Sequence, residues 1–573
     1  MKQKIFEIIQ TSIERAKKSG KLPAFVVPEI IVDHPNDKEH GDFSCSIALS
    51  IGKILKQNPM EIAQIIYDEI ELSDFDKVEI MKPGFINFFL SNNYLIDELE
   101  KILKEGDKYG SGTMNKTVVV DYSAPNIAKP FGIGHLRSTI IGQAIYNIYS
   151  FLGAKCIGDN HLGDWGTQFG KMIVAIKIWA NEDNIKDLTI ADLEKLYVKF
   201  HEESVVDGSD LEEQARSWFK KLEDGDEEAR AIWQTCIDIS LKEFDRIYKL
   251  LGVKIDYTLG ESFYGDKMIP IIEEALKKKI AKKSRGAVIV EFEDKNLPPA
   301  MILKSDEATN YFTRDLATIK YRLEAWDPDL IIYEVGAEQK LHFKQLFKTV
   351  NLLGWISEDK LVHVAHGFYR NKEGKFSTRK GKTIHLESVL NEAIDRARKV
   401  IDDSQTNKEL SDQEKNEISR IVGIGAVKYN DLSQHYSKEV VFDWDKILNL
   451  KGDSGPYLQY VYTRCASIVK KAEIDVKLKK KEVELNAEEL EILREIYKFP
   501  EVVRSAANKF SPNLICNFAF NLAQQFNSFY QAHSVLGADS EESKMFRVAL
   551  TQGVAQILKS SLLLLGIEIP EKM

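Results

Sequence analysis

The sequence predicts a multidomain α/β protein built around a doubly wound parallel sheet. Three observations predict it. The 573 residues exceed one ordinary core. A buried-strand signal at Val118–Val120 is followed by a helical pattern and a second strand. From about Gly452 onward the pattern is helical almost throughout. We therefore expect an α+β domain over 1–112, the parallel-sheet domain over 113–450 and an all-α domain over 451–573.

The first 112 residues have the pattern of a compact α+β module. An opening helix places Ile5, Ile9, Ile13 and Ala16 on one face and ends near Gly20. Later elements of this module are two helices and one strand, expected at Ser44–Leu55, Pro59–Ile70 and Phe85–Leu90. The polar, Gly-rich stretch 106–116 is typical of a linker.

The central region alternates strands and helices. The first strand, a helix over about His135–Leu152 and a strand at Ala154–Gly158 form a βαβ unit. Residues from about 185 to 250 are charged and helical, without a strand signal. Strand patterns resume at Ala287–Phe292, Leu330–Val335 and Leu361–Ala365, with a helix over Arg314–Trp326 between them. We interpret this region as one Rossmann-type domain interrupted by a helical insertion.

Composition excludes several classes of protein. With 78 Lys and Arg against 88 Asp and Glu, the net charge is −10, which is typical of a soluble globular protein rather than a basic nucleic-acid coat. A local basic face for nucleic acid remains open. The N-terminus lacks a signal-peptide core and no stretch is long enough to span a bilayer, so we expect a cytoplasmic protein. The five cysteines form no C-x-x-C pair, so no zinc site is expected.

The loop after the first strand, residues 121–135, carries the strongest chemical signal. It runs Asp121, Tyr122, Ser123, Ala124, Pro125, Asn126, Ile127, Ala128, Lys129, Pro130, Phe131, Gly132, Ile133, Gly134, His135. Its glycines allow close approach to the backbone, and a helix N-terminus attracts phosphate. A histidine there can donate a hydrogen bond to an oxygen that gains charge. Taken alone, the glycines are explained equally well by a tight structural turn.

A second stretch, Gly374–Lys382, combines four cations with two hydroxyls between glycines. By itself it is interpreted as a solvated surface turn. It does not stand alone, however, because this basic loop follows a strand of the same predicted sheet.

Together the two stretches resemble the HIGH and KMSKS motifs of class I aminoacyl-tRNA synthetases. They read Gly132-Ile133-Gly134-His135 and Lys375-Phe376-Ser377-Thr378-Arg379. Longer segments, SAPNIAKPFGIGHLRST, GDNHLGDWGTQFG, NYFTRDLATIKYR and FSTRKGKT, resemble arginyl-tRNA synthetases in family order, and the resemblance covers essentially the whole chain. It implies an arginine–tRNA ligase that uses ATP to form arginyl-adenylate and then transfers arginine to the 3′ end of tRNA(Arg).

The resemblance also implies where the substrates bind. Helical spacing places Tyr311 and Asp315 on one face, which for Asp315 alone is more simply a surface ion pair. By resemblance Asp315 binds the arginine guanidinium beside Tyr311. The other implied arginine contacts are Asp121, Tyr122, Ser123, Ala124, Pro125, Asn126, His135 and Gln339. The implied ATP contacts are Gly132, Gly134, His135, His366, Gly367, Lys375 and Thr378. Magnesium accompanies ATP, and no residue is expected to be a metal ligand.

Two positions depart from the family motifs. Gly132 replaces the first histidine of HIGH, and Thr378 replaces the second lysine of KMSKS. In arginyl enzymes a lysine upstream of HIGH is thought to replace that lysine, and Lys129 occupies its position. The expected catalytic residues are Lys129, His135, Lys375, Ser377 and Arg379.

The remaining expectations concern tRNA. Aromatic residues alternate with cations after Ser454, which suits stacking on unpaired bases, although half or more of these tyrosines are equally explained as core. We expect anticodon contacts at Tyr460, Arg464 and the terminal Met573. By resemblance the N-terminal domain binds the tRNA elbow (D-loop), the first reaction step needs bound tRNA, and the enzyme is a monomer.

Two alternatives remain open at this stage. One is another class I synthetase such as the cysteinyl enzyme, whose zinc site needs clustered cysteines that this chain lacks. The other is a catalytically silent tRNA-binding relative, which only Gly132 supports. Amino-acid-dependent ATP–pyrophosphate exchange separates these alternatives.

Overall fold

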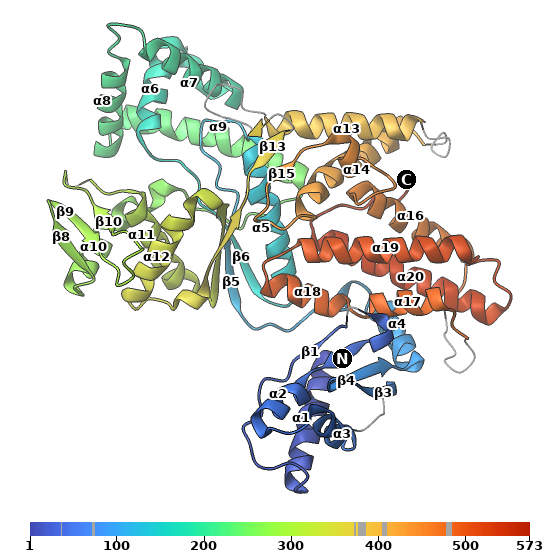
Figure 1. Cartoon of the computed structure of the whole chain (residues 1–573). Coiled ribbons are helices and arrows are strands. Elements are labelled where there is room, and N and C mark those ends of the chain that lie inside the picture. The colour runs from blue at the N-terminus through green and yellow to red at the C-terminus, as the bar shows by residue number, and fades with distance from the viewer. Residues whose placement is uncertain are drawn as a thin grey trace. The chain divides into compact units, whose positions relative to one another are not determined.

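The computed structural model describes residues 1–573 except 36, 71–74, 181, 307, 372–373, 376–384, 404–409 and 477–483. Figure 1 shows the chain. Its internal contacts divide it into two compact units. The first unit comprises Met1–Tyr109, Cys465–Phe499 and Leu522–Ile557, and the second comprises Gly110–Arg464, Pro500–Asn521 and Leu558–Met573. The domain boundaries predicted at 112 and 450 stay predictions.

The N-terminal part of the first unit is an antiparallel sheet with helices, as expected of an α+β module. Its strands are β1 (Val32–Asp33), β2 (Phe43–Cys45), β3 (Phe75–Met81) and β4 (Phe85–Leu90), in the order β1-β2-β4-β3. Its helices are α1 (Lys2–Lys18), α2 (Ile47–Leu55), α3 (Pro59–Tyr67) and α4 (Asn92–Glu105). The predicted apolar face of α1 is fully buried.

The helix predicted from Ser44 was wrong at its start. Residues Phe43–Cys45 form β2, which pairs Phe43 with Phe88 and Cys45 with Ile86, and α2 begins only at Ile47. Phe43 and Cys45 are both fully buried, an alternation that suits a strand. Three residues are too few for this period to be distinguished from a helix start by sequence alone.

The second unit is built on a five-stranded parallel sheet. Its strands are β5 (Thr117–Asp121), β6 (Lys155–Asn160), β7 (Tyr257–Thr258), β11 (Leu330–Gly336) and β12 (Leu361–His366). Their order is β12-β11-β5-β6-β7. The next strands along the chain, β6 and β7, lie on one side of β5. The later strands β11 and β12 lie on its other side. The strand order therefore reverses between β5 and β11, where ligands of such sheets bind beyond the carboxyl ends of the strands.

Helices pack against this sheet and enclose its core. They are α5 (Ile133–Phe151), α10 (Met268–Lys277), α11 (Tyr311–Trp326) and α12 (Lys340–Leu352), and Figure 1 shows α5 running beside β5 and β6. One buried cluster joins Val119 and Ile331 of the sheet to Leu316 of α11 and Leu346 of α12. This core fixes the strand ends from which the functional loops start.

A helical insertion follows β6, as predicted. It contains α6 (Thr167–Trp179), α7 (Ile190–Ser204), α8 (Leu211–Asp224) and α9 (Glu227–Leu251). Because α6 packs against both α7 and α8, the helical group begins before residue 185.

The strand predicted at Ala287–Phe292 lies outside the parallel sheet. It is β9 (Ala287–Val290), the centre of an antiparallel sheet with β8 (Ala281–Ser284) and β10 (Ala300–Leu303). Arg285 and Gly286 join β8 to β9, and both have positive φ. A two-residue turn of this kind forces an antiparallel hairpin, so β9 could not join the parallel sheet.

The rest of the chain is mainly helical. A small sheet contains β13 (Tyr369–Asn371), β14 (Gly374–Lys375) and β15 (Val440–Val441). The helices are α13 (Leu386–Asp403), α14 (Asp412–Leu432), α15 (Trp444–Ile447), α16 (Gly455–Ala472), α17 (Ala487–Ile496), α18 (Phe499–Asn508), α19 (Asn513–Ala532) and α20 (Glu541–Leu564). Within the described part, every regular element from Gly455 onward is a helix, as predicted. None of the helices in the described ranges has the length and apolar composition needed to cross a bilayer.

Candidate active site

The loop between β5 and α5 holds an unusual backbone conformation. Ser123, Ala124 and Ala128 have φ of 77°, 46° and 60°, a region that residues other than glycine rarely adopt. Side chains from three elements fix their amides. Ser123 N donates to Ser138 Oγ at 2.9 Å, Ala124 N to Asn160 Oδ1 at 3.0 Å, and Ala128 N to Ser240 Oγ at 2.9 Å. Strain of this kind gathers where a site is held in a set shape.

Helix α9 of the insertion supports the same loop. The Tyr248 hydroxyl lies 2.8 Å from Ser123 Oγ and accepts a hydrogen bond from Asn160 Nδ2 at 2.9 Å. The Phe131 ring meets the rings of Phe244 and Tyr248 edge-on, at centroid distances of 5.3 and 5.6 Å. The insertion is therefore part of the framework of the loop.

His135 lies in the first turn of α5 with a defined proton position. Its Nδ1 accepts a hydrogen bond from Gly132 N at 3.3 Å, so in the neutral ring the proton is on Nε2. Burial, together with the charges of Lys129 and His366, lowers the pKa of His135 to about 4. Next to it, a Cβ on Gly134 would meet no described atom within 4 Å. The helix N-terminus thus presents a neutral N–H donor beside open space.

The neutral state of His135 makes a pH prediction. Above pH 6.5 the ring is neutral in both the folded and the unfolded chain. Between pH 6.5 and about 4 only the unfolded chain binds the proton, so folding stability is lost as the pH falls. We expect wild type to lose about 1–2 kcal/mol more than His135→Asn between pH 7 and pH 5. Urea denaturation at both pH values measures this difference, and equal losses would contradict a depressed pKa.

A second histidine, His366, lies at the end of the neighbouring strand pair, β11 and β12. His366, buried at the end of β12, has Nδ1 3.1 Å from each carboxylate oxygen of the buried Glu334 on β11. Burial alone lowers the pKa of His366, but the charge and hydrogen bond of Glu334 together raise it above 6.5. Gly367 follows, and a Cβ there would lie 2.6 Å from the Lys438 carbonyl oxygen, so close backbone packing requires glycine.

The chain that follows the second motif contacts the first motif at Gly132. Gly132 forms an antiparallel bridge with His385, and Leu386 N donates to Phe131 O at 2.8 Å. His385 and Leu386 therefore lie beside the first loop. Lys375 is in β14, opposite Arg370 of β13. The predicted residues Ser377, Thr378 and Arg379 lie outside the described residues.

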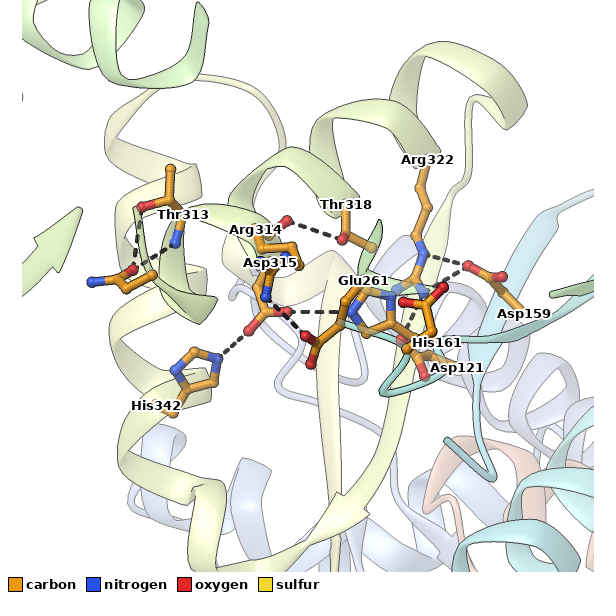
Figure 2. A network of polar contacts seen from close by, with 12 residues as sticks. Asp121, Asp159, His161, Glu261, Thr313, Arg314, Asp315, Thr318, Arg322 and His342 are labelled. Atoms are coloured by element: carbon orange, nitrogen blue, oxygen red, sulfur yellow. Dashed lines mark hydrogen bonds and ion pairs between the residues drawn. The ribbon is translucent and has the colours of Figure 1, made fainter. Parts of the chain in front are cut away.

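A polar network surrounds the residue predicted to bind the guanidinium, and Figure 2 shows it. Asp315 on α11 is partly buried. Its Oδ2 lies 2.6 Å from Nε2 of His342 on α12, and its Oδ1 lies 3.8 Å from Nε2 of His161. Tyr311, one turn earlier on α11, is 66 % exposed, with its ring 5.3 Å from that of His342. Gln339 is exposed at the start of α12.

Sequence reasoning assigned no role to His161, His342 or Glu261. Glu261 pairs with Arg314 at 2.8 Å, beside Asp315. His342 follows Gln339 by three residues, so helical spacing predicts both near one end of α12. His161 directly follows β6, and its position at the end of a strand is the sequence signal that could have identified it as a site residue.

Two residues predicted to contact arginine have side chains turned into the interior. The Asp121 carboxylate pairs with Arg322 at 2.6 Å, and Arg322 also binds Asp159. Tyr122 is fully buried and donates to the Lys254 carbonyl, and a Cβ on Gly142 would lie 2.3 Å from its Cβ and 2.5 Å from Cγ of its ring. These two side chains are fixed by the fold, so we do not carry them into the proposal below. Pro125 is buried and Asn126 is exposed beside Gly163.

The predicted tRNA contacts lie on different elements. On α16 the Arg464 guanidinium lies 4.6 Å from the Tyr460 ring centroid and donates to its hydroxyl at 2.6 Å. Met573 packs against a cluster of α13 and α14 that includes Ile401 and Val422. Among the described residues, no group of three or more His, Cys, Asp or Glu side chains is arranged to hold a metal ion.

The parallel sheet, with a glycine-containing loop and a histidine at its switch point, defines a class I aminoacyl-tRNA synthetase. Three family models match: "tRNA synthetases class I (R), catalytic domain" at residues 98–444, "Arginyl tRNA synthetase N terminal domain" at 3–90 and "DALR anticodon binding domain" at 458–573. The chain belongs to the arginyl-tRNA synthetase family.

Relatives over the full length agree. The chain is 41% identical over 577 residues to the arginine–tRNA ligase of Alkaliphilus metalliredigens, covering 100% of this chain and 99% of the relative. It is 42% identical over 550 residues to that of Clostridioides difficile, covering 95% and 96%. The crystal structure of Plasmodium falciparum arginyl-tRNA synthetase matches with a TM-score of 0.84 at 28% identity, covering 100% and 99%. The Thermus thermophilus enzyme matches in fold, with a TM-score of 0.82 at 21% identity and coverage of 98% and 99%. The predicted family, fold class, ligase function and enzyme class are confirmed.

Proposed function

We propose that His135 and Lys129 carry the activation of arginine in this arginine–tRNA ligase. The arginine carboxylate attacks the α-phosphate of ATP, and pyrophosphate leaves. The observation that carries the proposal is the Gly132 N–H to His135 Nδ1 hydrogen bond, because it leaves Nε2–H free to donate to an oxygen gaining charge. Lys129 lies on the same loop, and its charge contributes to the lowered pKa of His135, which supports a shared role. By resemblance, Lys375, Ser377, Thr378 and Arg379 act from the second motif.

ATP is proposed to lie across the N-terminus of α5 and the end of β12. Gly132 and Gly134 give access to the helix N-terminus, where free N–H groups favour phosphate. His366 and Gly367 lie at the neighbouring strand end and are assigned to adenine by the family resemblance. Magnesium would arrive with ATP, because phosphate oxygens are ligands that it prefers and the described residues offer no cluster of their own.

Arginine is proposed to lie between the first loop and α11. Asp315 would bind the guanidinium, with Tyr311 and Gln339 beside it, while Ser123, Ala124, Pro125 and Asn126 hold the α-amino acid end. The rings of His161 and His342 border the Asp315 carboxylate.

Asp315→Asn tests this assignment. The substitution keeps the shape and removes one charge-assisted contact, worth roughly 1.5–3 kcal/mol, so we expect the KM for arginine to rise about 10- to 100-fold. Asp327→Asn, at the other end of α11, is the matched control and should leave the KM unchanged. An unaltered KM for arginine in Asp315→Asn would remove this residue from the site.

The partner is tRNA(Arg), which we propose binds along three parts of the chain. The domain over 1–112 would contact the tRNA elbow, 113–450 would receive its 3′ end, and 451–573 would read the anticodon through residues that include Tyr460, Arg464 and Met573. We further propose that the enzyme is a cytoplasmic monomer without zinc, and that bound tRNA is needed for activation. Charging unfractionated tRNA with each amino acid separately tests the function, and only arginine should give product.

A further inference from the structure

Helix α7 of the insertion has two different faces. Leu193, Leu196 and Phe200 are buried in the insertion. Glu194, Tyr197 and His201, spaced three and four residues apart, share another face. Composition gave this helix no role, because a charged helix is usually a solvated one.

The second face of α7 contacts the first loop and His385. The Lys129 Nζ lies 5.0 Å from the centroid of the Tyr197 ring. The His385 Nε2, next to the end of the second motif, lies 3.6 Å from a Glu194 carboxylate oxygen. His201 stacks edge-on against Tyr197 at 4.6 Å, and the charge of Lys129 contributes to lowering its pKa, after burial and Lys171. Tyr197 is thus the centre of a contact between α7 and the first loop.

The kind of contact matters for phosphate chemistry. Within the described part of the chain, no carboxylate lies within ion-pair distance of Lys129. An acidic partner would orient the ammonium but neutralise the charge that the reaction needs. An aromatic face attracts the same cation through its quadrupole and leaves the charge in place.

We propose that Tyr197 is a positioning residue for the activation step, whose ring holds the Lys129 ammonium at the N-terminus of α5 with its charge available to ATP phosphate. The inference rests on the proposed role of Lys129. It gives the helical insertion a part in chemistry, since α7 places the cation while α9 fixes the loop that carries it.

Substitutions at Tyr197 separate this role from packing. Tyr197→Phe and Tyr197→Trp keep the aromatic face and should form adenylate at about the wild-type rate, whereas Tyr197→Leu should lower kcat by about three- to tenfold with the KM for arginine unchanged. Trp179→Leu removes the ring beneath Lys199, another cation–π pair of the insertion, and should leave kcat unaltered. Equal rates in the Leu and Phe variants would overturn the inference.

A structural readout distinguishes failure of the inference from failure of the proposed function. Lysine ε-amines are methylated reductively with ¹³C, and the Lys129 signal is assigned by its loss in Lys129→Arg. Its ring-current shift should persist in Tyr197→Phe and vanish in Tyr197→Leu. An unshifted signal in wild type would overturn the positioning while leaving the role of Lys129 intact. Normal adenylate formation by Lys129→Met would contradict both the positioning role of Tyr197 and the proposed role of Lys129.

Discussion

His135→Ala is expected to slow arginyl-adenylate formation by about 10²- to 10³-fold, the effect of removing one donor aimed at developing charge. The structure holds this imidazole neutral, with Nδ1 occupied by Gly132 N and Nε2–H free. The lost group is therefore a hydrogen-bond donor rather than a proton source. Single-turnover formation of adenylate, at saturating arginine, ATP and tRNA, measures the effect.

His135→Gln distinguishes donation from packing, because its amide supplies an N–H near the position of Nε2. It should retain clearly more activity than His135→Ala. His533→Ala, in the helices near the C-terminus, serves as the control for a histidine outside the site and should match wild type. A rate within a factor of about ten of wild type for His135→Ala would contradict a role in charge stabilisation.

Arg322→Met is expected to lower the free energy of unfolding by about 3–5 kcal/mol, because it leaves buried carboxylates without their cation. Arg322 is fully buried on α11 and joins the ends of β5 and β6. Its Nε and Nη2 donate to Asp159 at 2.9 and 2.7 Å, and Nη2 donates to Asp121 at 2.6 Å. Urea denaturation followed by tryptophan fluorescence measures the loss.

The loss of stability in Arg322→Met is attributed to the two carboxylates, Asp121 and Asp159, that it leaves without a cation. Burial, and then repulsion from Asp121, raises the pKa of Asp159 despite its bonds to Arg322. Removing both charges as well, in Asp121→Asn/Asp159→Asn/Arg322→Met, should recover much of the stability. Arg398→Met removes surface ion pairs with Asp402 and Asp412 and should lower the unfolding midpoint far less than Arg322→Met. Equal midpoints for the Arg322 and Arg398 variants would contradict the account.

Strand and helix periods in the sequence predicted most of the parallel sheet. Val118–Val120 is continuous and apolar because β5 is covered on both faces, and such runs identify buried parallel strands. The sheet to which a strand belongs depends on its turns instead. The Ala287 strand was misassigned because the hairpin turn at Arg285–Gly286, with arginine at positive φ, has a weak sequence signal.

Candidate site residues could be predicted where they are close together in one loop of the sequence. They could not be predicted where a side chain depends on a partner far away in the sequence. Glycines and a histidine after a strand are compatible with a phosphate site, although the glycines alone are explained equally well by a tight turn. Nothing near Asp121 in the sequence shows that Arg322, two hundred residues later, pairs with its carboxylate. Lys428 is similar: it is buried on α14 and donates to the carbonyls of Leu251 and Gly566. Burial lowers the pKa of Lys428 to about 8, which local sequence cannot reveal.

The opposite error concerned Tyr122, which the motif placed at the substrate. A residue inside a motif can point into the core, as the side chains of Tyr122 and Asp121 do. Gly142, one α5 turn after Ser138, provides the space for its ring. That dependence joins residues 122 and 142 and becomes visible only when the helix is packed.

The central claim is that this chain activates arginine with ATP by means of the site at the switch point of its parallel sheet. ATP–pyrophosphate exchange, measured with each amino acid in the presence and absence of tRNA(Arg), tests it most directly. The account predicts exchange with arginine and bound tRNA, and its loss in His135→Ala. Exchange supported by a different amino acid, or none with arginine and tRNA(Arg) together, would contradict it.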